Sequence, residues 1–404
     1  MDACGATAHT PRTTTSDVLV IGGGVIGLVT AWRAALRGLR VTVADPRPGG
    51  GAARVAAGML AAVTELHHGE EALLDLNLAS AGRYPAFAAE LAEAAGDPAA
   101  GPALIGYRRC GTLAVALDAD DRAELRELHL LQQRCGLAAE WLTGRECRRL
   151  EPMLAPGVRG GLRVDGDHQA DPRLLTDALL RACERAGVAF HRSAARALTL
   201  DITGERATGA RLEDGTPLTA GQVVLAAGSR SADLAGLPPD LPIPVRPVKG
   251  QILRLRMPPA NGPGGPFLSR TVRAVVRGGQ VYLVPRESGE LVIGATSEEL
   301  GWDTTVTAGG VYQLLRDAHE LIPGLTELPL TETRAGLRPG TPDNAPLLGP
   351  SGLPGLQLAT GHYRNGVLLA PVTGEALAES LTTGELPDWA RPFRAQRFGA
   401  EVPA

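Results

Sequence analysis

A strand, a glycine-rich turn, a helix and a second strand follow one another near the start of the chain, and this order constrains the fold more than any other feature. Residues 17–21 (DVLVI) form a short apolar run that is typical of a strand buried on both faces of a parallel sheet. The turn GGGVIG occupies residues 22–27, and apolar residues at helical spacing continue to a glycine at position 38. Residues 40–44 (RVTVA) predict the second strand, which ends at Asp45.

This arrangement is typical of the βαβ unit that binds a dinucleotide. The first glycine allows a tight turn, the second lets a pyrophosphate approach the backbone, and the third packs the helix against the strand. The helix N-terminus supplies partial positive charge, and the terminal acid accepts hydrogen bonds from ribose hydroxyls. A glycine-rich turn without function is the alternative, and the motif does not separate NAD from FAD. The predicted contacts are Gly22, Gly24, Val25, Ile26, Gly27 and Asp45.

Three later segments favour FAD over NAD. Residues 46–60 (PRPGGGAARVAAGML) are mostly small, so their backbone can lie flat against a large planar cofactor; a flexible loop is the alternative. Residues 222–228 (QVVLAAG) predict another buried strand that returns to the first sheet. Residues 359–371 (ATGHYRNGVLLAP) predict a strand, a turn and a helix start whose amides can face an electron-rich ring. A cofactor that contacts segments near both ends of the sequence must be long, which favours FAD.

Charge and composition exclude several classes of protein. The 404 residues carry 40 Lys and Arg against 44 Asp and Glu, which argues against a basic nucleic-acid surface. The five cysteines show no CxxC pair and no disulfide framework, so a reducing cytoplasm fits best. No stretch reaches the roughly 20 apolar residues that cross a bilayer, and residues 1–16 predict a disordered polar leader. We therefore expect a cytoplasmic protein of two or three domains that binds neither nucleic acid nor membrane.

Local patterns predict further elements outside the βαβ unit. One of the predicted helices carries its own boundary signals, with Asp171 as N-cap, Pro172 in the first turn and Gly187 after the last. Alternating apolar residues predict a hairpin, and proline–glycine clusters predict loops. The helices are expected at 120–133 and 171–186, the hairpin strands at 280–285 and 290–295 around a turn at 287–289, and the loops at 238–242 and 258–266.

Short motifs along the chain are modest one by one but form a specific ordered set. In chain order they are GGGVIG (22–27) with Asp45, AAGML (56–60), EP (151–152), VKGQILRL (248–255), YLVPR (282–286), IGATSE (293–298), AGLRPGTPDNAPLLG (335–349) and GHYRNGVLLAPVTG (361–374).

In this order the motifs resemble the D-amino-acid-oxidase superfamily of flavoproteins, and within it the glycine oxidases of thiamine biosynthesis. The resemblance covers the chain from Asp17 to Leu381. It implies an α/β fold with a Rossmann-like FAD-binding domain, non-covalently held FAD, and a second, antiparallel-sheet substrate domain. The expected boundaries are a leader at 1–16, a discontinuous FAD domain at 17–85, 145–235 and 330–385, a substrate domain at 86–144 and 236–329, and a tail at 386–404.

The resemblance also implies three residues that act on substrate. Arg338 matches the arginine that binds the substrate carboxylate, a task that suits a bidentate guanidinium. Arg364 matches a second arginine of the same pocket, and Tyr282 matches a tyrosine whose hydroxyl helps to fix the carboxylate. A surface arginine and a core tyrosine are the alternatives. Lys249, the only lysine, is an alternative oxygen activator, but its position at a strand start favours a structural role.

The remaining cofactor contacts implied by the resemblance lie in the small-residue segments. Hydroxyl side chains that usually face the FAD phosphates are replaced by Ala52, Ala53 and Arg54, so backbone amides and Arg54 are expected to contact the diphosphate. His362 is expected to contribute its backbone rather than acid–base chemistry. The full set is Pro46, Ala52, Ala53, Arg54, Ala57, Gly58, Met59, Ala195, Gly228, His362, Tyr363, Arg364, Asn365, Gly366, Val367 and Leu368.

The implied reaction is the oxidation of glycine, and also of sarcosine and small D-amino acids, by hydride transfer to flavin N5. The products are an imine that gives glyoxylate and ammonia, hydrogen peroxide from molecular oxygen, and material passed to thiazole synthase; the family also suggests a homotetramer. The nearer alternative is a sarcosine or D-amino-acid oxidase or a quinone-linked dehydrogenase of the same superfamily. A non-enzymatic flavoprotein partner in thiazole synthesis and an NAD-linked dehydrogenase are more distant alternatives.

Overall fold

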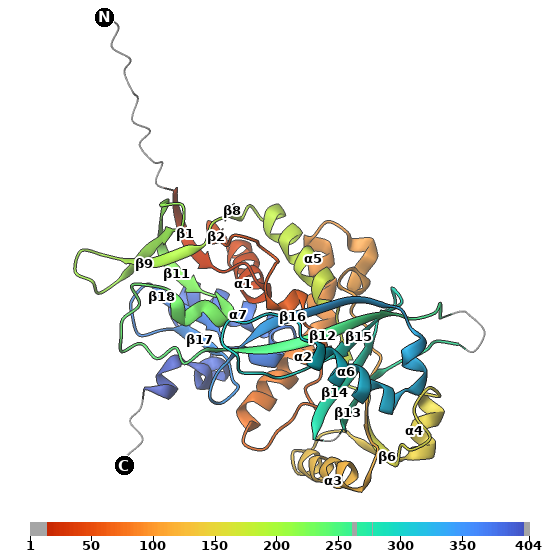
Figure 1. The fold of residues 1–404 in the computed structure, drawn as a ribbon. Helices are drawn as coiled ribbons and strands as arrows, with labels where there is room; N and C mark the ends of the chain where they lie inside the picture. The colour runs from red at the N-terminus through yellow and green to blue at the C-terminus, as the bar shows by residue number, and fades with distance from the viewer. Residues whose placement is uncertain (1–13, 261–264, 277, 400–404) are drawn as a thin grey trace, which may run out of the picture.

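Two eight-stranded sheets organise the computed structural model, which describes residues 14–260, 265–276 and 278–399 (Figure 1). In the first sheet, β1 (Thr14–Ile21) pairs in parallel with β2 (Val41–Ala44) on one side and β11 (Pro217–Leu225) on the other. The sheet is completed by β8 (Ala189–His191) and β18 (Leu356–Thr360) in parallel, and by β17 (Leu347–Pro350), β9 (Ala195–Leu200) and β10 (Ala207–Leu212) in antiparallel pairings.

Both faces of the first sheet are covered, which explains its continuously apolar strands. Val18, Leu19 and Val20 have no exposed surface. Strands β9 and β10 contribute to the core on one face, and four helices pack together on the other (Figure 1). These helices are α1 (Val25–Leu36), α2 (Glu71–Ala94), α5 (Pro172–Arg185) and α7 (Ala370–Thr383).

The second sheet is antiparallel except for one parallel pair, β13 with β4. One face packs against α6 (Ala308–Leu321), and the other brings Ile252, Val284 and Val292 against Ala57 of the small-residue segment. The strands, in spatial order, are β16 (Leu330–Gly340), β12 (Arg246–Arg256), β15 (Glu290–Gly294), β14 (Gly279–Pro285), β13 (Thr271–Val276), β4 (Thr112–Ala116), β6 (Gly160–Val164) and β5 (Glu140–Thr143).

Shorter elements connect the sheets. A two-stranded ribbon joins β3 (Met59–Leu60) to β7 (His168–Gln169), and α3 (Ala119–Arg134) and α4 (Gly144–Leu150) flank the end of the second sheet. The 3₁₀ helices are η1 (Ala52–Arg54), η2 (Pro98–Ile105), η3 (Gly228–Asp233), η4 (Pro323–Glu327), η5 (Tyr363–Asn365), η6 (Asp388–Phe393) and η7 (Ala395–Phe398). Within the described ranges, no helix is both long and apolar enough to span a bilayer.

The local predictions are confirmed with small shifts at their ends. Helices α3 and α5 occupy the two predicted segments, and the side chain of Asp171 caps α5 by accepting from the amides of Arg173 and Leu174. The hairpin β14–β15 forms around a turn in which Gly289 has a φ of 81°. The predicted loop at 258–266 lies partly outside the described residues.

The two sheets divide the chain differently from the predicted domain boundaries. Residues 160–164 and 330–340 were assigned to the FAD domain, but they form β6 and β16 of the second sheet. Residues 86–94 were assigned to the substrate domain, but they complete α2 on the first sheet. Strand pairing joins segments far apart in sequence, so local composition does not reveal the sheet to which a strand belongs.

The two predicted terminal segments also need correction. Residues 14–16 belong to β1 rather than to a disordered leader, and the rest of that leader, residues 1–13, lies outside the described residues. The predicted tail begins with η6 and η7, which bury Ala390, Phe393 and Ala395 against the first domain. The predicted tail therefore includes two helices, η6 and η7, that belong to the folded domain.

Candidate active site

The turn after β1 leaves room for a pyrophosphate where the sequence predicts one. Gly22 has a φ of 108°, and a Cβ at this position would lie 2.4 Å from the carbonyl oxygen of Ala226. A Cβ at Gly27 would lie 1.9 Å from the oxygen of Gly22, so only glycine permits this approach of helix and strand. At Gly24, by contrast, an added Cβ meets no described atom within 4 Å. The open side of Gly24 fits a bound pyrophosphate.

The start of α1 and the end of β2 complete this part of the site. Helix α1 begins at Val25 and Ile26 without a side-chain cap, so its first amides remain available to an anion. The Asp45 carboxylate accepts one hydrogen bond from the amide of Gly23 and one from the amide of Arg47, each of 2.7 Å. A carboxylate has about four acceptor positions, so Asp45 is held in place and can still accept ribose hydroxyls.

The segment after Asp45 forms η1 beside this turn. Ala52 and Ala53 carry no polar side chain, and the exposed Pro46 precedes them. The Arg54 guanidinium lies 2.5 Å from the Asp177 carboxylate of α5. The structure therefore places Arg54 in an ion pair rather than free to neutralise a phosphate, and the backbone remains as the source of diphosphate contacts in η1.

Gly58 brings the small-residue segment close to α5. Its φ is 73°, and a Cβ there would lie 2.0 Å from the oxygen of Ala170. The preceding Ala57 is buried, and its carbonyl accepts a hydrogen bond from the buried guanidinium of Arg286. Met59 begins β3 and packs against the second sheet. These contacts hold the segment between the two sheets. The family resemblance implies that the flavin binds along this segment.

The C-terminal turn contains His362 in a neutral form. Its ring is buried, its Nε2 lies 2.9 Å from the Thr373 hydroxyl, and burial lowers its pKa to about 3. Tyr363 follows with a φ of 46° and opens η5, which ends at Asn365. A buried imidazole with so low a pKa does not exchange protons near neutral pH, in keeping with a backbone role for this turn.

Backbone amides after η5 face no partner within the part of the chain that the structure describes. The amides of Val367 and Leu368 have no hydrogen-bond acceptor there, although both residues are buried. The carbonyls of Val367 and Leu368, in contrast, accept from the hydroxyls of Tyr84 and Ser80 on α2. Buried amides rarely stay unpaired, so this set of donors fits the electron-rich edge of a bound flavin.

Two further predicted contacts lie at the carboxyl ends of the first sheet. Gly228, with a φ of 57°, begins η3 after β11, and its carbonyl accepts from the hydroxyls of Ser231 and Thr360. Ala195 begins β9, just after β8 ends beside β2. Ligands of parallel sheets bind at the carboxyl ends of the strands, and the structure brings Gly22, Asp45 and Gly228 together there.

Tyr282 lies on β14, and its neighbours on the two adjacent strands determine the environment of its hydroxyl. It pairs across the sheet with Arg273 of β13 and with Gly294 of β15. A Cβ at Gly294 would lie 2.3 Å from the Tyr282 hydroxyl, so the phenol lies directly over this glycine. Burial raises the pKa of Tyr282, and the nearby Arg338 opposes this rise. The hydroxyl therefore stays protonated and can donate a hydrogen bond.

Arg338 is a guanidinium without a carboxylate partner among the described residues. It lies on β16 opposite Val248, and its Nη1 donates to the carbonyl of Thr296 at 3.2 Å. A Cβ at Gly250 would lie 2.2 Å from Nη1, so the side chain lies flat over the backbone of β12. Nη1 also lies 3.5 Å from the carbonyl oxygen of Lys249, and the guanidinium interacts with the Tyr282 hydroxyl. The five N–H donors of an arginine exceed these contacts, which leaves donors for a substrate carboxylate.

Arg364, the second predicted arginine, has carboxylate partners that the sequence analysis did not identify. Its guanidinium forms an ion pair with Glu70, and its Nε lies 3.7 Å from Glu65. Glu65 also binds Arg273 at 2.7 Å. The two acids share the segment between β3 and α2, whereas the arginines lie in β13 and η5, and no local motif indicates that these three segments meet. The only available signal was the position of Glu65 shortly after the AAGML motif.

Lys249 has the structural surroundings that the sequence analysis favoured. It is fully buried in β12, and its Nζ lies 2.7 Å from Asp303 and 3.6 Å from Glu298. The hydrogen bond to Asp303 raises the pKa of Lys249 and lowers that of Asp303. Both acids neutralise the ammonium group of Lys249, which fits a structural role for this residue.

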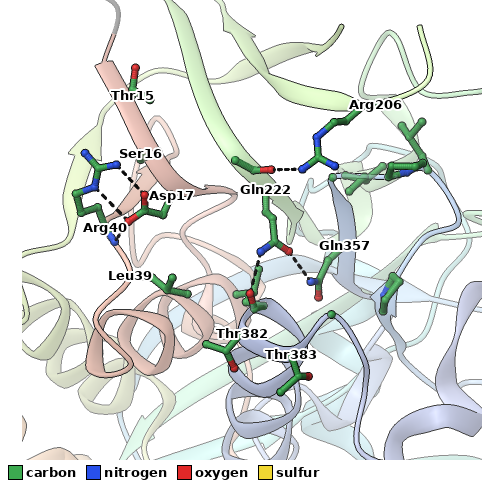
Figure 2. A pocket seen from close by; sticks show the side chains of 18 of the residues that line it. Thr15, Ser16, Asp17, Leu39, Arg40, Arg206, Gln222, Gln357, Thr382 and Thr383 are labelled. Carbon is green, nitrogen blue, oxygen red and sulfur yellow. Dashed lines mark hydrogen bonds and ion pairs between the residues drawn. The ribbon is translucent and has the colours of Figure 1, made fainter. Parts of the chain in front are cut away.

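A pocket at the opposite end of the first sheet offers no comparable set of free groups (Figure 2). Asp17 pairs there with Arg40 at 2.7 Å, and Gln222 bonds both Gln357 and the carbonyl of Leu381. Figure 2 shows the Asp17–Arg40 pair and the contacts of Gln222 with Gln357 and with the carbonyl of Leu381. The predicted cofactor contacts lie at the other ends of the parallel strands, so we assign this pocket no role in the reaction.

Comparisons with known proteins agree with the geometry. The model of the FAD dependent oxidoreductase family DAO matches residues 17–380. A bifunctional protein ThiO/ThiG of Synechocystis is 36% identical over 95% of this chain and 54% of its own length, so the chain spans about half of that relative. The glycine oxidase of Geobacillus kaustophilus is 34% identical over 96% of this chain and 98% of its own length. Its crystal structure superimposes with a TM-score of 0.85, covering 95% of this chain and 99% of that one at 33% identity.

Proposed function

This chain belongs to the DAO family of FAD-dependent oxidoreductases, and within that family we propose that it is a glycine oxidase that also accepts sarcosine and small D-amino acids. The observation that carries the proposal is the position of Arg338, unpaired with any described carboxylate, beside the protonated hydroxyl of Tyr282. A carboxylate bound by both groups receives charge-assisted hydrogen bonds in a defined orientation. The full-length similarity to a glycine oxidase supports glycine as the substrate.

The residues of the site bind and orient the substrate. When bound, FAD would supply the acceptor for a hydride from the substrate Cα, with molecular oxygen as the final electron acceptor and hydrogen peroxide as its product. Arg338 and Tyr282 hold the carboxylate and thereby fix the orientation of the Cα–H bond. The amine enters neutral, and His362, which is itself neutral and bonded to Thr373, takes no part in proton transfer. The imine product hydrolyses to glyoxylate and ammonia.

The relatives suggest where the product goes. Relatives that carry the name ThiO/ThiG join a region similar to this chain to a second region in one polypeptide. On that basis we propose that the imine is passed to a thiazole synthase in thiamine biosynthesis. A homotetramer remains a prediction from the family resemblance.

Peroxide formation with glycine, sarcosine, D-proline and D-alanine tests the activity. We expect glycine to be oxidised with oxygen as acceptor. Oxidation of D-proline or sarcosine with a much higher kcat/KM than glycine would identify the alternative oxidase, and turnover only with a quinone would identify a dehydrogenase. If the FAD-loaded protein oxidises none of these compounds, the proposed function is wrong.

The Arg338→Ala variant tests the carboxylate assignment. Loss of a charge-assisted bidentate contact costs about 2–5 kcal/mol, so kcat/KM for glycine should fall by more than tenfold, with the KM raised. Arg334→Ala is the matched control, because Arg334 lies on the same strand but is half-exposed and pairs with Glu332. An unchanged KM for glycine in Arg338→Ala would show that Arg338 does not bind the carboxylate.

A further inference from the structure

Four charged side chains near Tyr282 form a chain of ion pairs that the proposed reaction does not use. Glu65 bridges two arginines, with Oε1 at 2.7 Å from Arg273 and Oε2 at 3.7 Å from Arg364. Glu70 binds the other end of Arg364 and accepts a hydrogen bond of 2.8 Å from Asn344. The arginines come from β13 and η5, and the acids from the segment between β3 and α2.

The two acids balance the two arginines in a mostly buried setting. The side chains of Glu65, Glu70 and Arg273 are each 11% exposed, and that of Arg364 is 18% exposed. The exposed His67 adds no charge at neutral pH, because loss of hydration and the nearby Arg364 cation lower its pKa. The ion-pair chain is therefore neutral as a unit.

Arg338 differs from these two arginines because no described carboxylate neutralises it. It is linked to them through Tyr282, which pairs with Arg273 and interacts with Arg338. Tyr282 is thus near one guanidinium that no described carboxylate neutralises, Arg338, and near Arg273, which already holds Glu65. A substrate with one carboxylate can therefore bind to Arg338, the guanidinium that no described carboxylate neutralises.

We propose that Glu70, together with Glu65, determines the specificity of this oxidase for amino acids with a single carboxylate by keeping Arg364 neutralised. The inference rests on the proposed amino-acid oxidase function. A second substrate carboxylate near Arg364 would have to displace Glu70, which would leave a buried carboxylate without its partner. It would also meet the repulsion of two glutamates, and such repulsion is an effective means of rejecting a competing ligand.

Sarcosine and iminodiacetate provide the matched pair of substrates. Iminodiacetate is sarcosine with one hydrogen of the N-methyl group replaced by a carboxylate, so the pair isolates the second negative charge. For the wild-type holoenzyme we expect kcat/KM to favour sarcosine by roughly a hundredfold or more. Equal kcat/KM values for the two compounds would overturn the proposal without any variant.

The Glu70→Gln variant tests the residue itself. Glutamine keeps the shape of the side chain and an oxygen for Asn344, but it removes the charge that neutralises Arg364. We expect the preference for sarcosine over iminodiacetate to fall by roughly tenfold or more, since Arg364 then becomes available to the second carboxylate. Glu71→Gln is the control, because Glu71 is the neighbouring residue, is exposed, and lies in the first turn of α2. An unchanged preference in Glu70→Gln would overturn the role of Glu70.

Binding of unreactive ligands gives the same comparison without turnover. Acetate and malonate differ by one carboxylate, and their binding to the holoenzyme can be followed by the change in flavin absorption. Wild type should bind acetate more tightly than malonate, and Glu70→Gln should gain affinity for malonate. Tighter malonate binding by wild type would contradict the proposal. If wild type oxidises neither glycine nor sarcosine, the proposed function fails, whereas unchanged selectivity in an active Glu70→Gln enzyme contradicts this inference alone.

Discussion

The role of a residue depends more on what its side chain contacts than on which amino acid it is. Arg338, Arg364 and Arg54 were all predicted to bind a ligand, and all are arginines in motifs of the same family. In the structure Arg54 pairs with Asp177 and Arg364 pairs with Glu70, so Arg338 alone of the three keeps a guanidinium without a described carboxylate partner. A guanidinium is charged at any physiological pH, so the presence or absence of an acid beside it decides what it can bind.

His362 should make the stability of the protein depend on pH. Burial holds its folded pKa at about 3, below the ordinary 6.5, so the unfolded chain binds more protons between these values. The contribution of neutral His362 is complete above pH 6.5 and is lost progressively as the pH falls toward the folded pKa. Between pH 7 and pH 5 the free energy of unfolding should fall by about 2 kcal/mol because of this residue.

Urea unfolding of wild type and His362→Gln at pH 7 and pH 5 measures this effect. Glutamine can keep a hydrogen bond to Thr373 but does not titrate, so the variant should lose less stability on acidification. His319→Gln, a change at an exposed position of α6, should behave like wild type. Identical pH dependence of wild type and His362→Gln would show that the buried imidazole does not contribute.

At the scale of elements, glycines in the second sheet make room for the two side chains that we propose to bind substrate. Gly250 on β12 lies beneath the Arg338 guanidinium, and Gly294 on β15 lies beneath the Tyr282 hydroxyl. The sheet places Val248 opposite Arg338 and Gly294 opposite Tyr282, so the register of β16, β12, β15 and β14 brings the two side chains to the same region. A side chain at either glycine would occupy the space of a functional group.

Gly250→Ala should impair substrate binding while leaving the fold intact. The new methyl group would lie 2.2 Å from Nη1 of Arg338, and the flexible end of that side chain must move away. We expect the KM for glycine to rise by roughly tenfold, about 1.4 kcal/mol, with unchanged FAD content. Gly279→Ala is the control, because its Cβ would make only ordinary contacts, the nearest at 3.4 Å. A wild-type KM in Gly250→Ala would show that the position of Arg338 is not set by this strand.

At the scale of the whole molecule, the site lies where the two sheets meet. The first sheet contributes the carboxyl ends of β1, β2 and β11, and the second contributes Arg338 and Tyr282. The small-residue segment packs between them, with Ala57 against Ile252, Val284 and Val292. The predicted cofactor contacts come from both ends of the chain, so we expect FAD binding to require the assembled molecule.

Gly24→Val should abolish FAD binding without unfolding the protein. A Cβ at Gly24 meets no described atom within 4 Å, so the valine fits the apoprotein but fills the space for the pyrophosphate. We expect the purified variant to retain less than roughly a tenth of the wild-type FAD per chain, with an unchanged far-ultraviolet circular dichroism spectrum. Gly82→Ala, at an open position in α2, should keep its flavin. Full flavin content in Gly24→Val would place the pyrophosphate elsewhere.

Much of the fold could be predicted because its signals are local. The apolar run of β1, the glycines at positions 22, 24 and 27, and the cap at Asp171 each act through residues close in sequence, and the structure has all of these features. Family motifs identified Arg338 and Tyr282, which the structure brings together. The domain boundaries were less successful, because β6 and β16 join the second sheet through partners distant in sequence.

The amino-acid sequence by itself determined the class of fold, the dinucleotide-binding turn and the FAD family, since each depends on short-range geometry that particular residues impose. Only the tertiary structure decided which charges remain free. Glu65 and Glu70 lie in the segment between β3 and α2, Arg273 lies in β13 and Arg364 in η5, and nothing in their local sequence indicates that these three segments meet. The strength of an ion pair depends on distance and burial, and both arise only when the whole chain has folded.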